Sequence, residues 1–381
     1  MANNNENKIL NVPNLRFPEF SGEWVTKSIN DLAVVIGGGT PDTTVKSYWD
    51  GEIQWFTPSE IGKNKYVDSS LRTITEVGLN NSSAKLLPPN TILLSSRATI
   101  GECSLSLREC ATNQGFQCLV SKKCNVDFLY YLIQTKKKDL IRKSCGSTFL
   151  EISANEVRKI QVSVPSDVEQ QKIAELLSLI DERIATQNKI IEDLKKLKSA
   201  IRKKVFVSLK EEHTECCEIN QLLTYEQPTA YIVTNDEYST DTTLIPVLTA
   251  NKGFVLGYTD EDFGIYQKGE CIIFDDFTMD AKYVSFPFKV KSSAIKMLTA
   301  KPNVNLRFMF EYLSYLELKS EEHKRHYISE IASLVVELPS KEMQNKIASL
   351  MTSLDNKLAL EENTKVKYED EKQYQLSQMF I

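Results

Sequence analysis

Apolar residues recur at helical spacing in two long runs of the chain, and both runs lack proline and glycine. In the first run they lie three or four positions apart, with polar breaks at Gln187 and Lys198, as Ile173, Leu177, Ile180, Ile184, Ile191, Leu194, Ile201 and Val205. The second run repeats this pattern from Ile347 to Leu358 and weakens after Leu360. Such a seam is typical of a coiled coil. Because neither run has an apolar face broad enough for its own core, we expect the two helices to pack on each other, and an antiparallel pair would put the two domains at opposite ends.

The two runs are copies of one sequence. Val162–Arg183 reads VSVPSDVEQQKIAELLSLIDER and Val336–Lys357 reads VELPSKEMQNKIASLMTSLDNK, displaced by 174 residues from Pro165 to Pro339 without a gap. A duplicated helix after each of two unlike halves predicts a pseudo-twofold internal repeat.

The segments before the two helices mix short β-rich runs with turn residues. Both segments close with an amphipathic helix, Val126–Lys143 and Leu306–Arg325, whose aromatic face we interpret as core packing. The sequence therefore predicts an α+β protein with two α/β domains, at residues 1–165 and 208–339, and two spacer helices, at residues 166–207 and 340–381.

Charge is distributed unevenly along the 381 residues, whose net charge is −5. Residues 122–159 hold nine Lys or Arg against four Asp or Glu, and residues 282–325 hold the same numbers, so both stretches have a net charge of +5. Residues 208–281 hold 15 acids and three bases. The overall charge argues against a protein that coats nucleic acid, but each half carries a basic stretch suited to phosphate contacts.

The chain shows no sign of catalysis, of a bound metal or of a membrane segment. Its eight cysteines have no metal-ligand spacing, its polar start has no apolar segment, and it contains no GxxxxGK[ST] phosphate loop and no NPPY-type adenine-methylation motif. Asp275, Asp276, Asp280 and Lys282 lie too close in sequence to form a two-strand nuclease site. We expect a cytoplasmic protein without a catalytic site, a metal or a cofactor of its own.

Several short motifs, in order around the duplicated helix, resemble one known family. They are LRFPEFSGEW (15–24), IGGGTP (36–41), LLSSRATIGECSL (93–105), TNQGF (112–116), GSTFLEIS (146–153), LTANKGFVLGY (248–258) and IIFDDFT (272–278). With both proline-headed helices, they make the chain similar to the specificity subunit of a Type I restriction-modification system.

The resemblance implies a non-catalytic subunit with two target recognition domains, which read the halves of a bipartite, asymmetric sequence in double-stranded DNA. The N-terminal domain would read the 5′ half, and the spacer helices would act as a ruler. It also implies two methylation subunits that use S-adenosylmethionine to methylate adenine. Two motor-nuclease subunits, which use ATP and magnesium, would complete the restriction complex.

Polar residues on loops beside the basic stretches are our candidates for DNA contact, because base edges are read by hydrogen bonds and phosphates by cations. In the first domain they are Thr57, Ser59, Lys63, Arg97, Thr99, Asn113, Gln114, Lys143, Ser147 and Thr148. In the second domain they are Thr249, Asn251, Lys252, Thr278, Lys282, Lys324, Arg325 and His326. Arg97 suits guanine and Asn113 or Gln114 suits adenine, although the latter two could instead cap a turn. Asp275 or Asp276 could accept from a cytosine amino group.

Three alternatives stay open on the residues alone. The chain could target a system in which methylation and cleavage share one polypeptide. It could instead be a coiled-coil scaffold with two β-rich domains that bind protein or carbohydrate. An enzyme acting alone is the third reading, and the missing constellation of nucleophile, base or metal argues against it.

Overall fold

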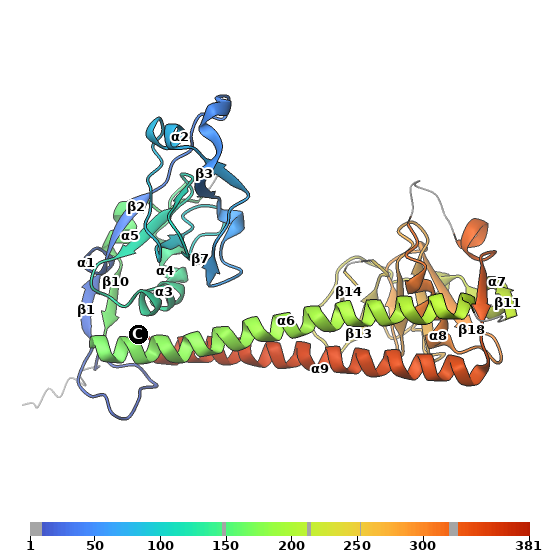
Figure 1. Ribbon diagram of the computed structural model, residues 1–381. Coiled ribbons are helices and arrows are strands. Elements are labelled where there is room, and N and C mark those ends of the chain that lie inside the picture. The colour runs from blue at the N-terminus through green and yellow to red at the C-terminus, as the bar shows by residue number, and fades with distance from the viewer. Residues whose placement is uncertain (1–9, 147–149, 212–214, 252, 320–326) are drawn as a thin grey trace, which may run out of the picture. The chain divides into compact units, whose positions relative to one another are not determined.

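The computed structural model describes residues 10–146, 150–211, 215–251, 253–319 and 327–381 (Figure 1). The chain divides into two compact units. Unit 1 comprises Met1–Asn188 and Asn363–Ile381, and unit 2 comprises Lys189–Glu362. Each unit contains an α+β domain, the beginning of one long helix and the end of the other.

Both predicted spacer helices are present. Helix α6 covers Asp167–Glu211 and helix α9 covers Lys341–Met379, so α6 continues four residues beyond its predicted end at Val207. In unit 1, Lys372 of α9 pairs with Asp181 of α6, and Tyr368, earlier in α9, lies against Arg183, later in α6. In unit 2, Lys198 of α6 pairs with Asp355 of α9, and Lys195, earlier in α6, pairs with Glu362, later in α9. The two helices are therefore antiparallel within each unit, as the seam predicts.

Domain 1, the part of unit 1 before α6, is built on three sheets. Their strand orders are β2-β9-β6-β7-β4, β5-β3-β8 and β1-β10. The strands are β1 (Val25–Ser28), β2 (Ala33–Gly37), β3 (Trp49–Phe56), β4 (Tyr66–Val67), β5 (Arg72–Ile74), β6 (Ile92–Leu94), β7 (Cys103–Ser106), β8 (Cys110–Thr112), β9 (Gln117–Ser121) and β10 (Gln161–Val164). The helices are α1 (Ile29–Leu32), α2 (Glu76–Asn80), α3 (Val126–Thr135), α4 (Lys137–Arg142) and α5 (Ala154–Lys159), with single turns η1 (Lys46–Tyr48) and η2 (Pro58–Glu60).

Domain 2, the part of unit 2 between α6 and α9, repeats this topology. Its sheets β12-β18-β15-β16, β14-β13-β17 and β11-β19 correspond to β2-β9-β6-β7, β5-β3-β8 and β1-β10. The strands are β11 (Glu215–Glu218), β12 (Leu223–Glu226), β13 (Ile245–Leu248), β14 (Val255–Thr259), β15 (Cys271–Asp275), β16 (Ala281–Val284), β17 (Lys289–Val290), β18 (Ile295–Ala300) and β19 (Val335–Leu338). The remaining elements are α7 (Ile219–Leu222), η3 (Pro228–Tyr231), α8 (Leu306–Tyr315) and the π-turn η4 (Tyr327–Ile331). The internal repeat thus extends beyond the helices to the domains.

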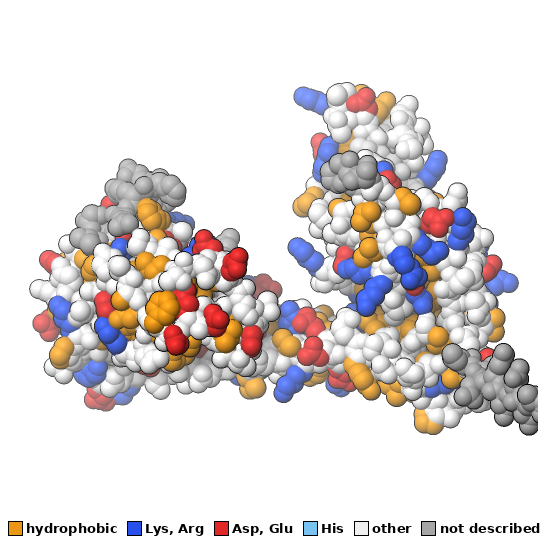
Figure 2. All heavy atoms as spheres, turned by 180° about the vertical axis from the view of Figure 1, so that it is seen from behind, with side chains coloured by type: hydrophobic (Ala, Val, Ile, Leu, Met, Phe, Trp, Pro, Cys, Tyr) orange, Lys and Arg blue, Asp and Glu red, His pale blue; other side chains and the backbone are white. Residues whose placement is uncertain are grey.

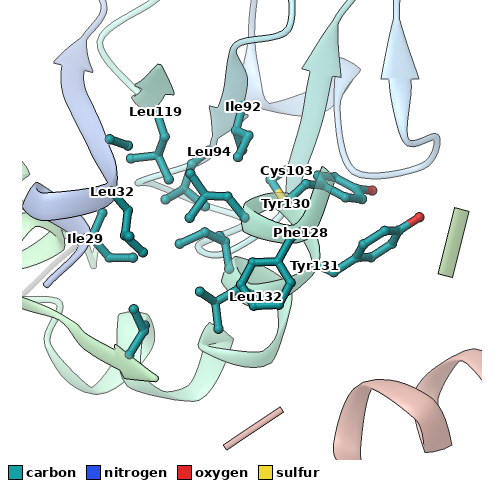
Figure 3. Close-up of a cluster of buried hydrophobic side chains, with 14 of the residues drawn as sticks. Ile29, Leu32, Ile92, Leu94, Cys103, Leu119, Phe128, Tyr130, Tyr131 and Leu132 are labelled. Atoms are coloured by element: carbon teal, nitrogen blue, oxygen red, sulfur yellow. The ribbon is translucent and has the colours of Figure 1, made fainter. Parts of the chain in front are cut away.

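Helix α3 joins domain 1 to the long helices. Its aromatic face is buried, as predicted: Phe128 and Tyr131 are fully buried in one cluster with Ile92 and Leu119 of the sheet (Figure 3). The same cluster takes in Leu177 of α6 together with the end of α9, where Phe380 lies 5.3 Å from Phe128 between ring centroids. Helix α8 does the same in unit 2, where Phe206 of α6 lies 5.6 Å from Phe308.

A hydrogen-bonded joint fixes the start of α3 to the start of α6. The side chain of Gln170, 3% exposed, accepts from the backbone N–H of Asn125 (3.0 Å) and donates to the carbonyl of Pro165 (3.1 Å). The side chain of Asn125 in turn caps α3 by accepting from the N–H of Phe128.

Unit 2 contains the same joint. The side chain of Gln344 accepts from the backbone N–H of Asn305 (2.9 Å) and donates to the carbonyl of Pro339 (2.9 Å). Asn305 caps α8 through the N–H of Phe308. Each domain is therefore held in a defined orientation on the helix that follows it in the chain.

Candidate nucleic-acid interface

Loops from distant parts of domain 1 meet at one edge of its small sheet. Strands β3 and β8 are parallel, so both end at the same edge, and the N–H of Asn113 donates to the carbonyl of Phe56 (3.1 Å). This places two sequence-predicted positions, Thr57 and Asn113, side by side.

Two further loops join this edge. The N–H of Ser96 donates to the carbonyl of Gly115 (2.8 Å), which brings in the loop that holds Arg97 and Thr99. On the other side, the N–H of Gly39 donates to the carbonyl of Thr112 (2.8 Å). A Cβ on Gly39 would stand 2.3 Å from the backbone nitrogen of Ala84, so this close approach requires glycine. We call residues 38–41, 57–60, 95–99 and 113–115 the loop cluster of domain 1.

Some candidates in the loop cluster are already engaged in local structure. Thr57 forms a capping box with Glu60, and the side chain of Asn113 accepts from the N–H of Gly115 (2.8 Å). Asn113 therefore caps a turn, which was the alternative role for it. The hydroxyl of Thr99 donates to that of Ser95 (3.1 Å). Ser59 and Gln114 are exposed, and Gln114 accepts from the hydroxyl of Thr40.

Arg97 is held at the rim of the loop cluster by an exposed ion pair. Its guanidinium lies 2.7 Å from the carboxylate of Glu151, and the two side chains are 43% and 37% exposed. An ion pair this exposed adds at most about 1 kcal/mol to stability, so a ligand could replace Glu151 at little cost.

The other candidates of domain 1 are less well placed. Lys63 is exposed, but it lines a groove against α6 with Ser178 and Asn188, and the described contacts do not bring it to the loop cluster. Lys143 lies 4.0 Å from Glu156. Ser147 and Thr148 lie outside the described residues.

The candidates of domain 2 are more scattered. Asn251 and Thr278 are exposed and Lys282 is half-buried on β16. Thr249 is only 7% exposed, so the structure does not support a direct DNA contact for it. Lys252, Lys324, Arg325 and His326 lie outside the described residues.

The two aspartates offered for cytosine contact belong to the fold instead. Asp275 is 6% exposed and accepts from the N–H groups of Phe277 (2.9 Å) and Thr278 (3.0 Å). Asp276 is 1% exposed, lies 3.3 Å from the ammonium of Lys296 and accepts from the N–H of Tyr327 (2.7 Å). They shape the turn after β15, and the expectation that they read a base is wrong for this conformation.

The topology reveals a position that the sequence did not. Strands β13 and β17 are parallel, and the N–H of Lys291 donates to the carbonyl of Leu248 (3.1 Å), as Asn113 does to Phe56 in domain 1. The exposed Lys291 and the half-buried Ser292 therefore occupy in domain 2 the places of Asn113 and Gln114. Only the shared strand order identifies them, because the two loops have no sequence in common.

Three cations in the basic stretch of domain 2 are held in ion pairs inside the domain. Arg307 and the fully buried Lys289 and Lys296 form ion pairs with carboxylates that are also mostly buried, and Lys301 donates to the carbonyl of Asn220. Burial disfavours the charged form of Glu261, but hydrogen bonds from Lys289 and Thr234 outweigh this and lower the pKa of Glu261 to about 2. Part of the acidic segment therefore neutralises lysines inside the domain.

The faces of the two units that are visible in Figure 2 differ in charge, although the two basic stretches have the same net charge. Figure 2 shows Lys and Arg side chains gathered on the visible face of unit 1, and Asp and Glu among hydrophobic side chains on that of unit 2. Of the nine cations in residues 282–325, two are outside the described residues and four make the internal contacts above, which leaves Lys282, Lys291 and Lys319 as phosphate candidates.

Within the described ranges, no three His, Cys, Asp or Glu side chains lie together as metal ligands. No helix in that part of the chain is long and apolar enough to cross a membrane.

Comparison with known proteins finds one family. A family model described as "Type I restriction modification DNA specificity domain" matches residues 21–196 and again residues 213–369. The specificity subunit of the Type I restriction enzyme MjaIX from Methanocaldococcus jannaschii is 37% identical over 216 residues, which are 55% of this chain and 50% of that protein. The specificity subunit of EcoR124I/EcoR124II from Escherichia coli is 41% identical over 142 residues, 36% of this chain and 35% of that protein. The matches thus span half or less of these relatives.

Solved structures share the fold. The S subunit of the Type I restriction-modification system from M. genitalium aligns over 97% of this chain and 99% of its own, with a TM-score of 0.62 and 17% identity. A chain from a structure of the assembly of a type I restriction-modification system aligns over 94% and 97%, with a TM-score of 0.57 and 13% identity.

Proposed function

This chain belongs to the family of Type I restriction modification DNA specificity domains, and on that premise we propose that it reads a bipartite sequence in double-stranded DNA. Domain 1 would read one half-site through its loop cluster, and domain 2 would read the other through the loops after β13, β15 and β17. The observation that carries this proposal is an equivalent arrangement of loops with different sequences. In each domain, loops gather at the ends of two parallel strands of the three-stranded sheet, β3 and β8 in domain 1 and β13 and β17 in domain 2. Equal architecture with unequal loops suits the reading of two different half-sites.

Methylation and cleavage would come from partner subunits. The proposed complex contains two methylation subunits that carry S-adenosylmethionine and two motor-nuclease subunits that use ATP and magnesium, while this chain supplies the target. The paired helices would set the gap between the half-sites. The family match argues against a scaffold for protein or carbohydrate. A partner in which methylation and cleavage share one polypeptide would use the same surfaces of this chain.

Co-expression with the cognate methylation subunit tests the proposal. Sequencing of the host DNA should show new N6-methyladenine in a split motif with two short half-sites and a fixed gap. A stable complex that methylates no such motif would contradict the proposal.

A further inference from the structure

Beside its apolar contacts, each domain helix places one fully buried side chain with polar atoms against the long helices, Tyr131 of α3 and Glu311 of α8. We call these two residues the central side chains, and they differ in chemistry. The seat of a domain is the part of α6 and α9 on which it docks: residues 173–181 with 372–380 for domain 1, and residues 198–206 with 347–355 for domain 2. The duplication relates the seats by 174 positions, and the equivalent caps Asn125 and Asn305 relate α3 to α8 by 180 positions. By this register Tyr131 of α3 corresponds to Glu311 of α8.

In seat 1 the central side chain is a neutral phenol. The hydroxyl of Tyr131 donates to Asp181 (2.6 Å), which also pairs with Lys372 (2.7 Å). Burial and the adjacent Asp181 raise the pKa of Tyr131, so it remains a hydrogen-bond donor at neutral pH. The same hydrophobic cluster contains Leu376, one turn after Lys372.

In seat 2 the central side chain is an anion with no exposed surface. The carboxylate of Glu311 lies 2.7 Å from Arg202 and 3.5 Å from Lys198 of α6, and 2.7 Å from Arg307 of its own helix. Asp355 completes the group by pairing with Lys198 and Arg307.

Some equivalent positions carry the same residue type in both seats, and others differ. Asp181 and Lys372 of seat 1 recur in seat 2 as Asp355 and Lys198, so the helix ion pair is common to both. What changes is the central residue and two neighbours: Tyr131 with Leu376 and Asp127 in seat 1, and Glu311 with Arg202 and Arg307 in seat 2. Asp127 pairs with Lys65 of domain 1 (2.6 Å), whereas Arg307 pairs with Glu311 itself.

These two combinations are not interchangeable on electrostatic grounds. The cations nearest the Tyr131 ring are Lys65 (4.9 Å) and Lys372 (5.6 Å), and each already pairs with an aspartate, Asp127 and Asp181. A glutamate in seat 1 would therefore add a buried third anion to two cations. A tyrosine in seat 2 would leave Arg202 without its buried carboxylate. Removing one partner of a buried ion pair is strongly destabilising, because the remaining charge is left without compensation.

We propose that Tyr131 with Leu376, and Glu311 with Arg202, are matched pairs that determine which domain docks on which seat. They are positioning residues: they contact no DNA, and they fix each domain on its own part of the helix pair. The inference concerns docking within the chain and does not depend on what the domains bind.

The test transplants each pair into the other seat of the full chain. Denaturant unfolding of unit 1 would be compared for Tyr131→Glu, Leu376→Arg and the double variant, and of unit 2 for Glu311→Tyr, Arg202→Leu and their double. Tryptophan fluorescence follows unit 1, which contains all three tryptophans, and hydrogen exchange of the backbone amides of residues 189–362 follows unit 2. We expect each double variant to be more stable than the sum of its single changes predicts, by about tenfold or more in the unfolding equilibrium constant.

A cross-seat control separates matching from general damage. Tyr131→Glu combined with Arg202→Leu joins changes in different units and should be additive. Additive behaviour of the two matched doubles as well would overturn the proposal. Where Tyr131→Glu alone gives no soluble chain, the double with Leu376→Arg should restore soluble chain, and its failure to do so would equally count against the pairing. Because the readout is unfolding, a failure here is distinct from a failure to recognise DNA.

Discussion

At the scale of single residues, the structure separates side chains committed to the fold from those available to a ligand. The sequence selected loops of domain 1 that the structure brings together, because Thr57 and Asn113 follow strands that end at one edge and the loop of Arg97 is hydrogen-bonded to Gly115. It could not show that Asp276 meets Lys296 from another strand, since that contact depends on how β15 and β18 pair. Nor could the sequence identify Lys291 as a candidate for DNA contact, because its place at the end of β13 follows from its backbone hydrogen bond to Leu248.

Loss of Arg97 should relax recognition at one base position. A bidentate base contact contributes about 1–3 kcal/mol of discrimination, whereas the exposed ion pair with Glu151 contributes at most about 1 kcal/mol to folding. The methylation motif of a complex with Arg97→Ala should therefore be degenerate at one position while its stability stays close to that of the parent.

Glu151→Ala is the matched control for that change, because it breaks the same ion pair and retains the guanidinium. Its motif should be unaltered. Equal degeneracy in both variants would assign Arg97 to holding the loop in place, and an unaltered motif in Arg97→Ala would remove it from base reading.

Lys291 should contribute to DNA affinity without contributing to sequence choice. If its ammonium contacts a phosphate, Lys291→Ala should weaken binding to all sequences alike and reduce the slope of log affinity against log salt by about 0.9. Titrations at several salt concentrations would measure this. Lys301→Ala is the control, because it also removes one positive charge, but from a side chain that is bound to the carbonyl of Asn220. If both variants reduce the slope equally, the net charge of the chain and not a contact by Lys291 sets the salt dependence.

At the scale of elements, the strongly periodic parts of the chain were predictable and the irregular parts were not. Helices α6 and α9 follow from the seam and from Pro165 and Pro339. The repeated strand order did not, because β13 and β3 share no sequence pattern and short strands are defined by their neighbours rather than by their own residues. The hydrogen-bonded joint was present in the sequence, since Gln170 and Gln344 hold equivalent positions in the duplication, but their partners are visible only in three dimensions.

Each joint should contribute separately to stability. Gln170→Ala leaves the N–H of Asn125 and the carbonyl of Pro165 without their partner, and an unsatisfied buried polar group costs about 1–3 kcal/mol. Gln344→Ala should have a similar effect in unit 2, and the two losses should add, because the residues lie in different units. Urea unfolding of the single and double variants would measure this.

Gln171→Ala provides the comparison for the first joint, because it removes an exposed hydrogen bond to the same Asn125. The stability lost in Gln171→Ala should be smaller than that lost in Gln170→Ala. A loss as large as that of Gln170→Ala would show that the buried joint has no special weight.

At the scale of the whole molecule, the two helices pair in one register in both units. The ion pairs Asp181–Lys372 and Lys198–Asp355 occupy equivalent positions of the duplication and have residue numbers with the same sum, so each unit pairs its two helix segments in the same register. A change in the length of one helix alone would break this agreement.

Matched insertions should change the target in a defined way. Four residues after Gln187 and four after Val366 add about one turn, roughly 6 Å, to both helices and preserve both ion pairs. On the proposed function, the gap between half-sites should lengthen by about two base pairs, at about 3.4 Å each. Sequencing of methylated DNA would measure the gap. An unchanged gap in a folded, active complex would show that the helices do not set it, and the insertion in α6 alone should instead lower stability.

The joint at Gln170 and Gln344 has a further consequence for how such a chain can be altered. In both units its bonds reach a backbone carbonyl and the backbone N–H of the capping asparagine, and only at Gln170 do they also reach the side chains of Cys124 and Asp167. The joint therefore places little demand on the identity of the residues beyond it. A foreign domain that begins its docking helix with an asparagine cap could be grafted onto either long helix, provided that its central residue suits the chosen seat. New specificities could then be assembled by exchanging whole domains, with two or three residues to adjust at each junction.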